Sequence, residues 1–355
     1  MSTKNSQTSF PKSALIAMSG GVDSTVAALL MLRGGVDCDG ATMMVFEDAG
    51  KTVEDAQKVA EQLHIPFHVF DFIDYFAKNV IDPFITDYRE GRTPNPCVVC
   101  NKMLKFGRFM DKAFELGKDC IITGHYAQVE QNATGRYLLK KGADLSKDQS
   151  YVLYSLTQEQ LARSIFPIGC YTKAQVREIA IDEGYGNASK GESQDICFIP
   201  DGDYVRFIRE YTGEPPKKGR FIDVNGKDLG ENKGVSSYTI GQRRGLGLSM
   251  PHPPYVIELR PEDNTVVVGK EDMLYSKSLD AEDINLIPVD KLDTPIRAQV
   301  KIRYSDPGHS AIVHQISENK LHIEFDEAKR AITKGQAAVI YDGDLVIGGG
   351  TIARC

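Results

Sequence analysis

The sequence lacks an apolar run long enough to cross a membrane. Its first apolar run, Ala14–Met18, follows a polar N-terminus, and the next one is confined between Asp23 and Arg33. A membrane-spanning helix needs about 20 apolar residues, and the start of the chain does not have the pattern of a signal peptide. We therefore expect a cytoplasmic protein without a membrane partner.

The sequence also lacks a cysteine framework. Its seven cysteines are scattered over the chain, and only Cys97 and Cys100 are close neighbours. Disulfide-stapled secreted domains are richer in cysteine, whereas neighbouring cysteines in a cytosolic chain indicate metal binding or catalysis. Four cysteines without a partner at metal-ligand spacing are expected to be packing or surface thiols: Cys38, Cys120, Cys170 and Cys355.

Neither sign of charge is in large excess. The 355 residues include 42 basic and 49 acidic side chains, a net charge of −7, and 41% of the residues are hydrophobic. This balance excludes a disordered, collagen-like or coiled-coil chain, and the length allows two or three domains. The mild acidity argues against general affinity for nucleic acid, but it leaves room for a local basic surface.

The first part of the chain, to about residue 210, alternates between strand and helix patterns. Such alternation predicts an α/β fold, a parallel sheet covered by helices. The segment from Gly91 to Pro96 is predicted to be neither helix nor strand, because its two prolines restrict themselves and the residues before them. Strands are expected at Ala14–Met18, Ala41–Phe46, Phe67–Phe70 and from Ile121, and helices at Val22–Leu32, Val53–Leu63, Ile73–Tyr88 and Met103–Leu116.

The character of the sequence changes after about Tyr211. Helical patterns give way to closely spaced turn signals, such as Val224–Lys227 and Tyr341–Asp344. From Arg297 to Tyr304 apolar and polar residues alternate, which predicts a half-buried antiparallel strand with a basic outer face. We expect three domains: a parallel α/β domain over residues 1–210, a small mixed domain over 211–275 and an antiparallel β-barrel over 276–355.

The strongest chemical signal is the string Ser19-Gly20-Gly21-Val22-Asp23-Ser24, which stands between a predicted strand and a predicted helix. Glycines let the backbone approach an anion, and a helix N-terminus offers N–H groups and a favourable dipole. The string does not fit the Walker P-loop pattern. It resembles the PP-loop of the ATP pyrophosphatases, which implies that ATP is bound and cleaved between its α and β phosphates.

A second signal is the pair Cys97 and Cys100, which follows the proline segment, with Cys197 further along the chain. A pair with this spacing is typical of zinc sites, but no second pair completes four ligands. Thioredoxin-like redox chemistry is a further alternative. Cys100 stands near a predicted helix start with Lys102 and Lys105 close by, and both features are expected to lower the pKa of its thiol.

Six motifs that together span nearly the whole chain resemble those of the bacterial tRNA-specific 2-thiouridylases. They are Ser19–Ser24, Thr93–Lys102, Thr123–Ala127, Lys147–Tyr151, Ile196–Ile199 and Gly241–Gly247. The resemblance implies that sulfur replaces the 2-oxygen of the wobble uridine in tRNA, and that ATP is consumed and bound with Mg²⁺. It implies ATP contacts at Ala17, Met18, Ser19, Gly20, Gly21, Val22, Asp23, Ser24, Met43 and Gly124.

The resemblance also assigns roles to the cysteines. In the family's usual account Cys197 carries a persulfide received from a sulfur-relay protein and Cys100 is the nucleophile, so that a Cys100–Cys197 disulfide closes the cycle. Many members have aspartate at the position of Cys97, where it is assigned an acid/base or base-contacting role. With a cysteine there, a second route stays open: Cys97, Cys100 and Cys197 would hold a [4Fe–4S] cluster whose open iron binds hydrosulfide.

Contacts with tRNA are implied by the same resemblance. The target base is expected to meet Asn95, Pro96 and Cys97 after it has left its stack. Further tRNA contacts are expected at His125, Lys147, Asp148, Gln149, Arg303, Tyr304 and Gln336. Two short basic segments, Lys217–Arg220 and Arg243–Arg244, suit phosphate groups although the whole chain is acidic.

Two other functions remain alternatives at this point. A PP-loop ligase with a different acceptor would cleave ATP whether or not Cys100 is present. A non-enzymatic RNA-binding protein, with zinc held by its cysteine pair, would bind tRNA without releasing pyrophosphate. Pyrophosphate release measured with and without tRNA separates the three functions.

Overall fold

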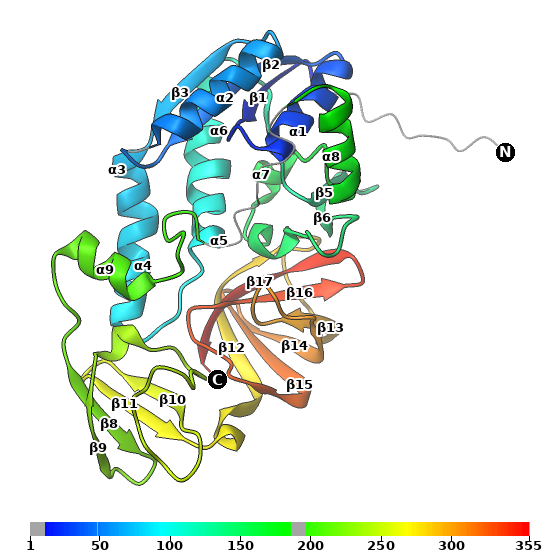
Figure 1. The fold of residues 1–355 in the computed structure, drawn as a ribbon. Coiled ribbons are helices and arrows are strands. Elements are labelled where there is room, and N and C mark those ends of the chain that lie inside the picture. Colours follow the sequence, from blue (N-terminus) through cyan, green and yellow to red (C-terminus); the bar gives the residue numbers. More distant parts are fainter. Residues whose placement is uncertain (1–10, 48, 186–195, 355) are drawn as a thin grey trace. The chain divides into compact units, whose positions relative to one another are not determined.

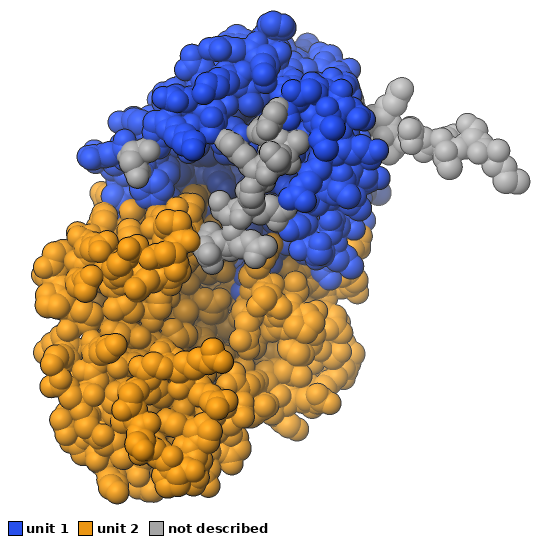
Figure 2. Space-filling model, in the orientation of Figure 1, with its two compact units in different colours: residues 1–77, 101–191 blue, residues 78–100, 192–355 orange. Residues whose placement is uncertain are grey.

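The computed structural model describes residues 11–47, 49–185 and 196–354. The chain divides into two compact units, which Figure 2 shows in different colours. Unit 1 comprises residues 1–77 and 101–191, and unit 2 comprises residues 78–100 and 192–355. In the part of the chain that the structure describes, no helix is long and apolar enough to cross a membrane.

Unit 1 is built on a five-stranded parallel sheet with the strand order β3-β2-β1-β4-β7. Figure 1 labels its first three strands, β1, β2 and β3. This sheet confirms the predicted α/β fold, in which helices carry the chain from one parallel strand to the next. Its strands are β1 (Ser13–Ala17), β2 (Asp37–Met44), β3 (Phe67–Asp71), β4 (Cys120–Ile122) and β7 (Ser164–Ile165), and the first helices are α1 (Val22–Arg33), α2 (Gly50–Gln62) and α3 (Ile73–Phe76).

The centre of the sheet is buried on both faces. Ala14 of β1 belongs to the same apolar cluster as Val26 of α1 and Val176 of α8 (Lys173–Asp182). Leu15 points to the opposite face, because side chains alternate along a strand, and it is fully buried as well. Burial on both faces explains why β1 is a continuous apolar run in the sequence.

The connection from β4 to β7 carries an antiparallel hairpin and short helices. The hairpin pairs Ala127 with Lys141 and Gln131 with Tyr137. A segment of residues 142–150 follows it and leads into the next helical turn. Its elements are β5 (Ala127–Gln131), β6 (Tyr137–Lys141), η3 (Ser150–Leu153) and α7 (Gln158–Ala162).

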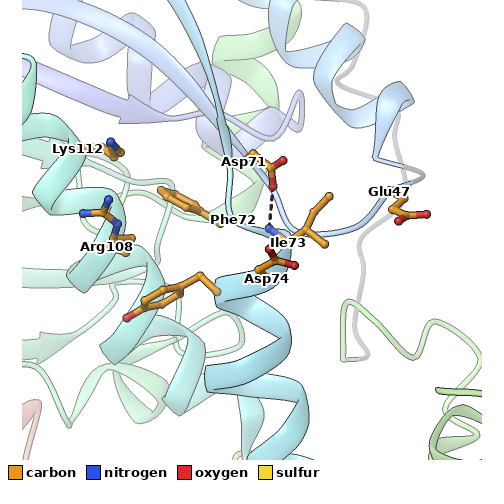
Figure 3. A pocket seen from close by; sticks show the side chains of 8 residues that line it. Glu47, Asp71, Phe72, Ile73, Asp74, Arg108 and Lys112 are labelled. Atoms are coloured by element: carbon orange, nitrogen blue, oxygen red, sulfur yellow. Dashed lines mark hydrogen bonds between the residues drawn. The ribbon is translucent and has the colours of Figure 1, made fainter. Parts of the chain in front are cut away.

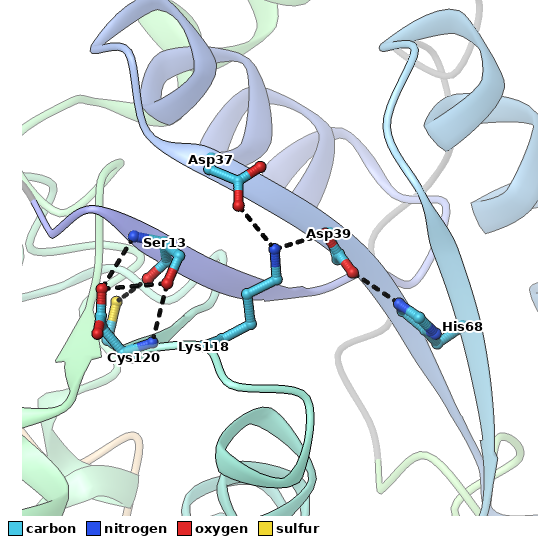
Figure 4. A network of polar contacts seen from close by, with 7 residues as sticks. Ser13, Asp37, Asp39, His68, Lys118 and Cys120 are labelled. Carbon is cyan, nitrogen blue, oxygen red and sulfur yellow. Dashed lines mark hydrogen bonds and ion pairs between the residues drawn. The ribbon is translucent and has the colours of Figure 1, made fainter.

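A polar network joins the strands of this sheet toward their amino ends (Figure 4). The Lys118 ammonium, just before β4, lies 3.0 Å from Asp37 Oδ2 and 2.7 Å from Asp39 Oδ1, and His68 of β3 bonds to Asp39 Oδ2 at 2.8 Å. Burial acts to raise the pKa of Asp39, but the hydrogen bonds from Lys118 and His68 outweigh it and hold that pKa below its usual value. The network therefore ties three elements together while the opposite end of β1 is left for the Ser19–Ser24 loop.

Two of the predicted packing thiols lie on this sheet. Cys38 on β2 and Cys120 on β4 are 3% and 4% exposed, and Ala14 of β1 stands between them. Burial, with neighbouring acidic charge, raises the pKa of each thiol to about 12. Cys170 is exposed. These positions confirm the prediction for three of the four cysteines, and Cys355 lies outside the described residues.

We expect this burial to show in alkylation rates. Iodoacetamide at pH 8 reacts with the thiolate, and a pKa raised from 9.0 to about 12 leaves roughly a thousandfold less thiolate in Cys38 and Cys120. Mass spectrometry of the intact native chain and its peptides should find the exposed Cys97, Cys170 and Cys197 modified first. Equal rates at all five positions would contradict the burial.

Of the two helical stretches between β3 and β4, the second begins earlier than the sequence predicts. From α3 the chain continues through the π-helical η1 (Ala77–Ile81) into α4 (Asp82–Arg89), as expected for Ile73–Tyr88. The next helix, however, begins at Pro96 as α5 (Pro96–Cys100) and continues through the π-helical η2 (Asn101–Arg108) into α6 (Phe109–Glu115). The prediction for Pro96 was wrong because proline fits the first helical position, where its missing N–H is not needed.

Unit 2 contains a small mixed sheet with the strand order β10-β11-β8-β9. Strands β8 and β11 are parallel and the other pairs are antiparallel. Phe221, Val256 and Val266 lie in the buried cluster on this sheet. The elements are α9 (Tyr204–Thr212), β8 (Gly219–Asp223), β9 (Asp228–Asn232), η5 (Val235–Ser237), β10 (Tyr255–Arg260), β11 (Thr265–Gly269) and η6 (Glu271–Leu274).

The last six strands of unit 2 form the predicted antiparallel barrel. Strand β12 pairs with both β15 and β17, and this second pairing closes the sheet. Val300, Val313 and Ile340 lie in the buried cluster that fills it. The strands are β12 (Tyr275–Leu286), β13 (Ile296–Lys301), β14 (His309–Ser317), β15 (Lys320–Arg330), β16 (Ala337–Asp342) and β17 (Leu345–Arg354).

Candidate functional site

The Ser19–Ser24 loop follows β1 and is held by its own hydroxyl groups. The Ser19 N–H donates to Ser24 Oγ at 3.3 Å, and Ser24 Oγ donates to the Gly21 carbonyl at 3.1 Å. Helix α1 begins at Val22 with Gly21 at its N-cap, which has no side chain to cap the first N–H groups. Backbone N–H groups and the positive end of the helix dipole are thus presented at the loop, an arrangement that suits phosphate.

Glycines allow neighbouring segments to approach this loop. Gly20 has a φ of +68°, and a Cβ there would lie 2.6 Å from the Cβ of Asp55 in α2. A Cβ on Gly124, which follows β4, would lie 2.8 Å from the Asp23 carbonyl carbon and 2.9 Å from the Ser24 nitrogen. Gly124 therefore packs directly against the Ser19–Ser24 loop, and both were predicted to contact ATP.

The end of β2 is also tied to the loop. Thr42 Oγ1 donates to the Met18 carbonyl at 2.6 Å, and the Met18 N–H donates to the Ala41 carbonyl at 2.8 Å. The half-buried Met43 lies in the last part of β2. The residues predicted to contact ATP thus come from adjacent strands, at the carboxyl edge where parallel sheets bind ligands.

Asp23 has two partners that sequence reasoning missed. The Lys173 ammonium, at the start of α8, lies 2.7 and 2.8 Å from the two carboxylate oxygens, and the Tyr126 hydroxyl donates to Oδ1 at 2.7 Å. Tyr126 lies in the quoted motif Thr123–Ala127, so a signal for it was present. Lys173 is 150 positions from Asp23, and only the packing of α8 brings them together.

His125 occupies an enclosed position after β4. It is 7% exposed, its Nδ1 lies 2.7 Å from Thr123 Oγ1, and its ring packs with those of Phe106 and Phe166, whose centroids lie 5.7 and 5.8 Å away. Burial, with the charge of Lys105, holds the pKa of His125 well below its usual value. The imidazole is therefore neutral near pH 7, and its contact with tRNA stays a prediction.

The predicted tRNA-contacting residues Lys147–Gln149 lie in the segment of residues 142–150. Asp148 is 8% exposed, and its carboxylate accepts hydrogen bonds from the Gly142 N–H and from the N–H and hydroxyl of Ser150. Gln149 Oε1 accepts the Tyr126 N–H at 3.0 Å. Asp148 and Gln149 thus hold this segment in shape, while Lys147 is half-buried.

Cys97 and Cys100 lie in successive turns of the helix that begins at Pro96. Asn95 precedes the helix, and its carbonyl and Oδ1 both accept the Val98 N–H, at 3.2 and 3.4 Å. Cys97 is exposed and Cys100 is half-buried. Since the helix starts earlier than predicted, its N-terminal dipole acts on the first-turn Cys97 rather than on Cys100.

Gln336 supports the proline segment that leads to these cysteines. Its Nε2 donates to the carbonyls of Thr93 at 3.0 Å and Pro94 at 3.2 Å, and the Thr93 N–H donates to the Lys334 carbonyl at 2.8 Å. A residue predicted to contact tRNA therefore also fixes the backbone before Asn95. Thr93 and Gln336 are 243 positions apart, so the sequence alone does not predict the hydrogen bond between them.

Cys197 is exposed beside an aromatic cluster of unit 2. The adjacent Phe198 packs edge-on against Phe84 of α4, with ring centroids 5.2 Å apart, and lies 5.1 Å from Phe207 of α9. Aromatic packing of this kind fixes the backbone next to Cys197. Within the motif Ile196–Ile199, the buried Phe198 therefore holds the exposed Cys197 in place.

Arg303 and Tyr304 do not lie on a strand, contrary to the prediction. β13 ends at Lys301, because the Asp306 carboxylate accepts the Ile302 N–H at 3.2 Å and turns the chain. The Arg303 guanidinium donates to the Arg330 carbonyl at 3.1 Å, and Tyr304 is 48% exposed.

The two predicted basic segments differ in how far their charges are neutralised. Lys218 pairs with Glu231 and Arg220 with Asp228 on β8 and β9. Arg243 and Arg244 are exposed. The second segment is therefore the better candidate for phosphate contacts.

The structure does not show a metal site at the three cysteines in the part of the chain that it describes. Over residues 11–47, 49–185 and 196–354, no group of three His, Cys, Asp or Glu side chains is arranged to hold a metal ion. Cys97, Cys100 and Cys197 all belong to unit 2, and a [4Fe–4S] cluster would need their three thiolates around one centre; the cluster route stays a prediction.

An open pocket of about 530 Å³ lies in unit 1 at the carboxyl end of β3 (Figure 3). Acidic side chains, with Ile73, line one side, and Arg108 and Lys112 line the other. The predicted site residues are not among its lining residues, which are Glu47, Asp71, Phe72, Ile73, Asp74, Tyr75, Arg108 and Lys112.

Comparison with known proteins covers nearly the whole chain. Family models match at residues 12–201 (tRNA methyl transferase HUP domain), 205–270 (tRNA methyl transferase PRC-barrel domain) and 276–352 (aminomethyltransferase beta-barrel domain). A solved 4-thiouridine synthetase–RNA complex with bound ATP is similar with a TM-score of 0.37 and 19% identity, over 54% of this chain and 46% of that chain.

Curated relatives are much more similar. The tRNA-specific 2-thiouridylase MnmA of Clostridioides difficile (strain 630) is 47% identical, over 97% of this chain and 98% of that protein. The protein of the same name from Halothermothrix orenii (strain H 168) is 45% identical, over 95% of this chain and 98% of its own length. The chain belongs to the tRNA-specific 2-thiouridylase family.

Proposed function

We propose that this chain is a tRNA-uridine 2-sulfurtransferase, which uses ATP to replace the 2-oxygen of the wobble uridine by sulfur. The observation that carries the proposal is the 47% identity, over nearly the full length of both chains, to a protein named for this reaction. The phosphate-binding geometry of the Ser19–Ser24 loop and the exposed thiols in unit 2 support it.

The nucleotide site of this proposal is the carboxyl edge of the parallel sheet. The residues from Ala17 to Ser24 would bind the phosphates, with Met43 and Gly124 beside them. Mg²⁺ would enter with ATP, and the Asp23 carboxylate is the hard oxygen ligand that the loop offers it. The Lys173 ammonium next to Asp23 adds positive charge where the leaving pyrophosphate becomes negative.

The first chemical step activates a carbonyl oxygen. The uridine 2-oxygen attacks the α-phosphorus, the bond from this phosphorus to the bridging oxygen of the β phosphate breaks, and pyrophosphate leaves with that electron pair. Carbon 2 of the base then carries AMP as a leaving group. Without this activation, oxygen at a carbonyl carbon is a poor leaving group.

The second step transfers sulfur. The terminal sulfur of a Cys197 persulfide attacks carbon 2, and the bond from this carbon to the AMP oxygen breaks. The Cys100 thiolate then attacks the Cys197 sulfur, the persulfide bond breaks, and its electrons stay on the sulfur at carbon 2. The products are 2-thiouridine, AMP and a Cys100–Cys197 disulfide, which a dithiol reductant reopens before a sulfur-relay protein reloads Cys197.

The relay is preferred to the cluster route, and this choice is supported by the described residues, among which no group of three His, Cys, Asp or Glu side chains is arranged to hold a metal ion. The exposure of Cys197 suits a thiol that receives sulfur from another protein. Cys97, at the exposed first turn of its helix, is then a helper beside the target base.

For the RNA, we propose that the flipped base meets Asn95, Pro96 and Cys97. His125, Lys147, Asp148, Gln149, Arg303, Tyr304 and Gln336 are the further proposed contacts. We also propose the three-domain division at residues 210 and 275, and action in the cytoplasm, where tRNA is modified.

The test is release of pyrophosphate by the purified chain with ATP, measured with and without tRNA. We expect a transcript with uridine at the wobble position to stimulate release at least tenfold, and a transcript with cytidine there not to stimulate it. Pyrophosphate release at the same rate with and without tRNA would favour a ligase with another acceptor. Binding of tRNA without any release would favour a non-enzymatic RNA-binding protein.

A further inference from the structure

Tyr126 is bonded to two segments of unit 1 that have separate tasks in the proposed function. Its hydroxyl donates to Asp23 Oδ1 at 2.7 Å, in the loop proposed to bind ATP. Its main chain is held by Gln149, in the segment proposed to contact tRNA: Gln149 Oε1 accepts the Tyr126 N–H at 3.0 Å, and the Gln149 N–H donates to the Tyr126 carbonyl at 2.9 Å. With 3% of its surface exposed, Tyr126 has little room to move independently of either segment.

A second connection runs beside the first. Lys173 pairs with Asp23, and its Nζ also lies 5.6 Å from the centre of the Tyr126 ring, a cation–π distance. The Lys173 N–H donates to Asp144 Oδ2 at 3.0 Å. Asp144 and Gln149 both belong to the segment of residues 142–150, so this segment reaches Asp23 through Tyr126 and through Lys173.

The segment itself is braced from inside. Asp148 accepts hydrogen bonds from Gly142 and Ser150 at its two ends, and the Lys147 N–H donates to the Asp144 carbonyl at 3.0 Å. A displacement at the half-buried Lys147 is therefore passed to Asp144 and Gln149 together rather than absorbed locally.

We propose that Tyr126 is a positioning residue that couples tRNA on the segment of residues 142–150 to ATP on the Ser19–Ser24 loop. A ligand that fixes the segment also fixes Asp23 and Lys173, so less freedom is left to lose when ATP binds. Linkage then requires tRNA and ATP to tighten each other's binding by the same factor. The inference rests on the proposed function, because that function supplies the tRNA contact.

The test is titration with α,β-methylene-ATP, which cannot be cleaved between its α and β phosphates, in the presence and absence of tRNA. Tyr126→Phe removes the hydroxyl and keeps the ring, and Gln149→Leu removes the side-chain bond to the Tyr126 N–H. We expect tRNA to tighten analogue binding about tenfold in the wild type, within the usual range of coupling, and less than about twofold in either variant. The double variant should lose little more than each single one, because both changes break one connection.

Gln158→Leu is the matched control. Gln158 holds Tyr137 of β6 as Gln149 holds Tyr126: its Oε1 accepts the Tyr137 N–H at 2.9 Å and its Nε2 donates to the Tyr137 carbonyl at 2.9 Å. This variant should keep the wild-type response to tRNA. A loss equal to that in Gln149→Leu would show general loosening of the unit and would refute the coupling.

The remaining outcomes separate the inference from the proposed function. If wild type and both variants respond to tRNA equally, or if a wild type that thiolates tRNA shows no response, the inference fails and the proposed function stands. If the wild type neither binds nor thiolates tRNA, the proposed function fails, and the inference that rests on it fails as well.

Discussion

Cys100→Ser is expected to abolish 2-thiouridine formation while pyrophosphate release continues for about one turnover. The serine hydroxyl stays protonated near pH 7 and is a far weaker nucleophile than a thiolate, so the persulfide bond at Cys197 is not broken. The loss should exceed about a thousandfold, the scale of removing a covalent nucleophile. Cys197→Ser should abolish the same product, since it leaves no thiol to carry the transferred sulfur. Nucleoside mass spectrometry of digested tRNA, with a parallel pyrophosphate assay, measures both.

Cys170→Ser is the control for this prediction. Cys170 is exposed like Cys197, but it stands outside the quoted motifs, so its replacement should leave thiolation unchanged. Iron and acid-labile sulfide in protein purified without oxygen provide a second check. We expect neither to be present in stoichiometric amount. About four of each per chain, lost in Cys97→Asp, would instead mean that the cysteines bind a cluster, and the relay roles of Cys100 and Cys197 would be wrong.

Gly124→Ala is expected to weaken ATP binding by roughly thirtyfold, the middle of a range of about 5- to 150-fold that overpacking gives. The added Cβ would lie 2.8 and 2.9 Å from the backbone of Asp23 and Ser24. Backbone atoms cannot rotate away as a side chain can, so the Ser19–Ser24 loop must shift and lose its alignment with α1. Overpacking of this kind costs about 1–3 kcal/mol, and a factor of ten corresponds to about 1.4 kcal/mol. Titration with α,β-methylene-ATP gives the change in Kd.

Gly50→Ala is the matched control for Gly124→Ala. A Cβ at Gly50 would have no other atom within 4 Å, so this variant should bind the analogue as the wild type does. Thermal unfolding of both variants shows whether either has lost its fold. A folded Gly124→Ala variant with wild-type affinity would mean that the phosphates do not depend on this loop geometry.

The sequence alone predicted the features that depend on residues close together in the chain. The run Ala14–Met18, the glycines after it and the periodic pattern of the next helix lie within about twenty positions, and they predicted a strand, a loop and a helix that the structure contains. Alternating strand and helix patterns also predicted the parallel sheet, because each pattern reflects burial of one local face.

Features that depend on distant packing were missed. Lys173 reaches Asp23 only because α8 lies on the same face of the sheet as α1. No short sequence pattern predicts this ion pair. Gln336 supports the carbonyls of Thr93 and Pro94 through a pairing that joins opposite ends of unit 2 in sequence. The early start at Pro96 was missed for another reason: proline is a strong helix breaker inside a helix but a good first residue.

The most direct test of the account is the stoichiometry of one reaction. The purified chain would be incubated with ATP, a persulfide donor and a tRNA transcript with uridine at the wobble position, and AMP, pyrophosphate and 2-thiouridine would be counted together. The account predicts one AMP and one pyrophosphate for each 2-thiouridine, and no 2-thiouridine when cytidine replaces that uridine. AMP and pyrophosphate formed without 2-thiouridine, or 2-thiouridine formed without them, would contradict it.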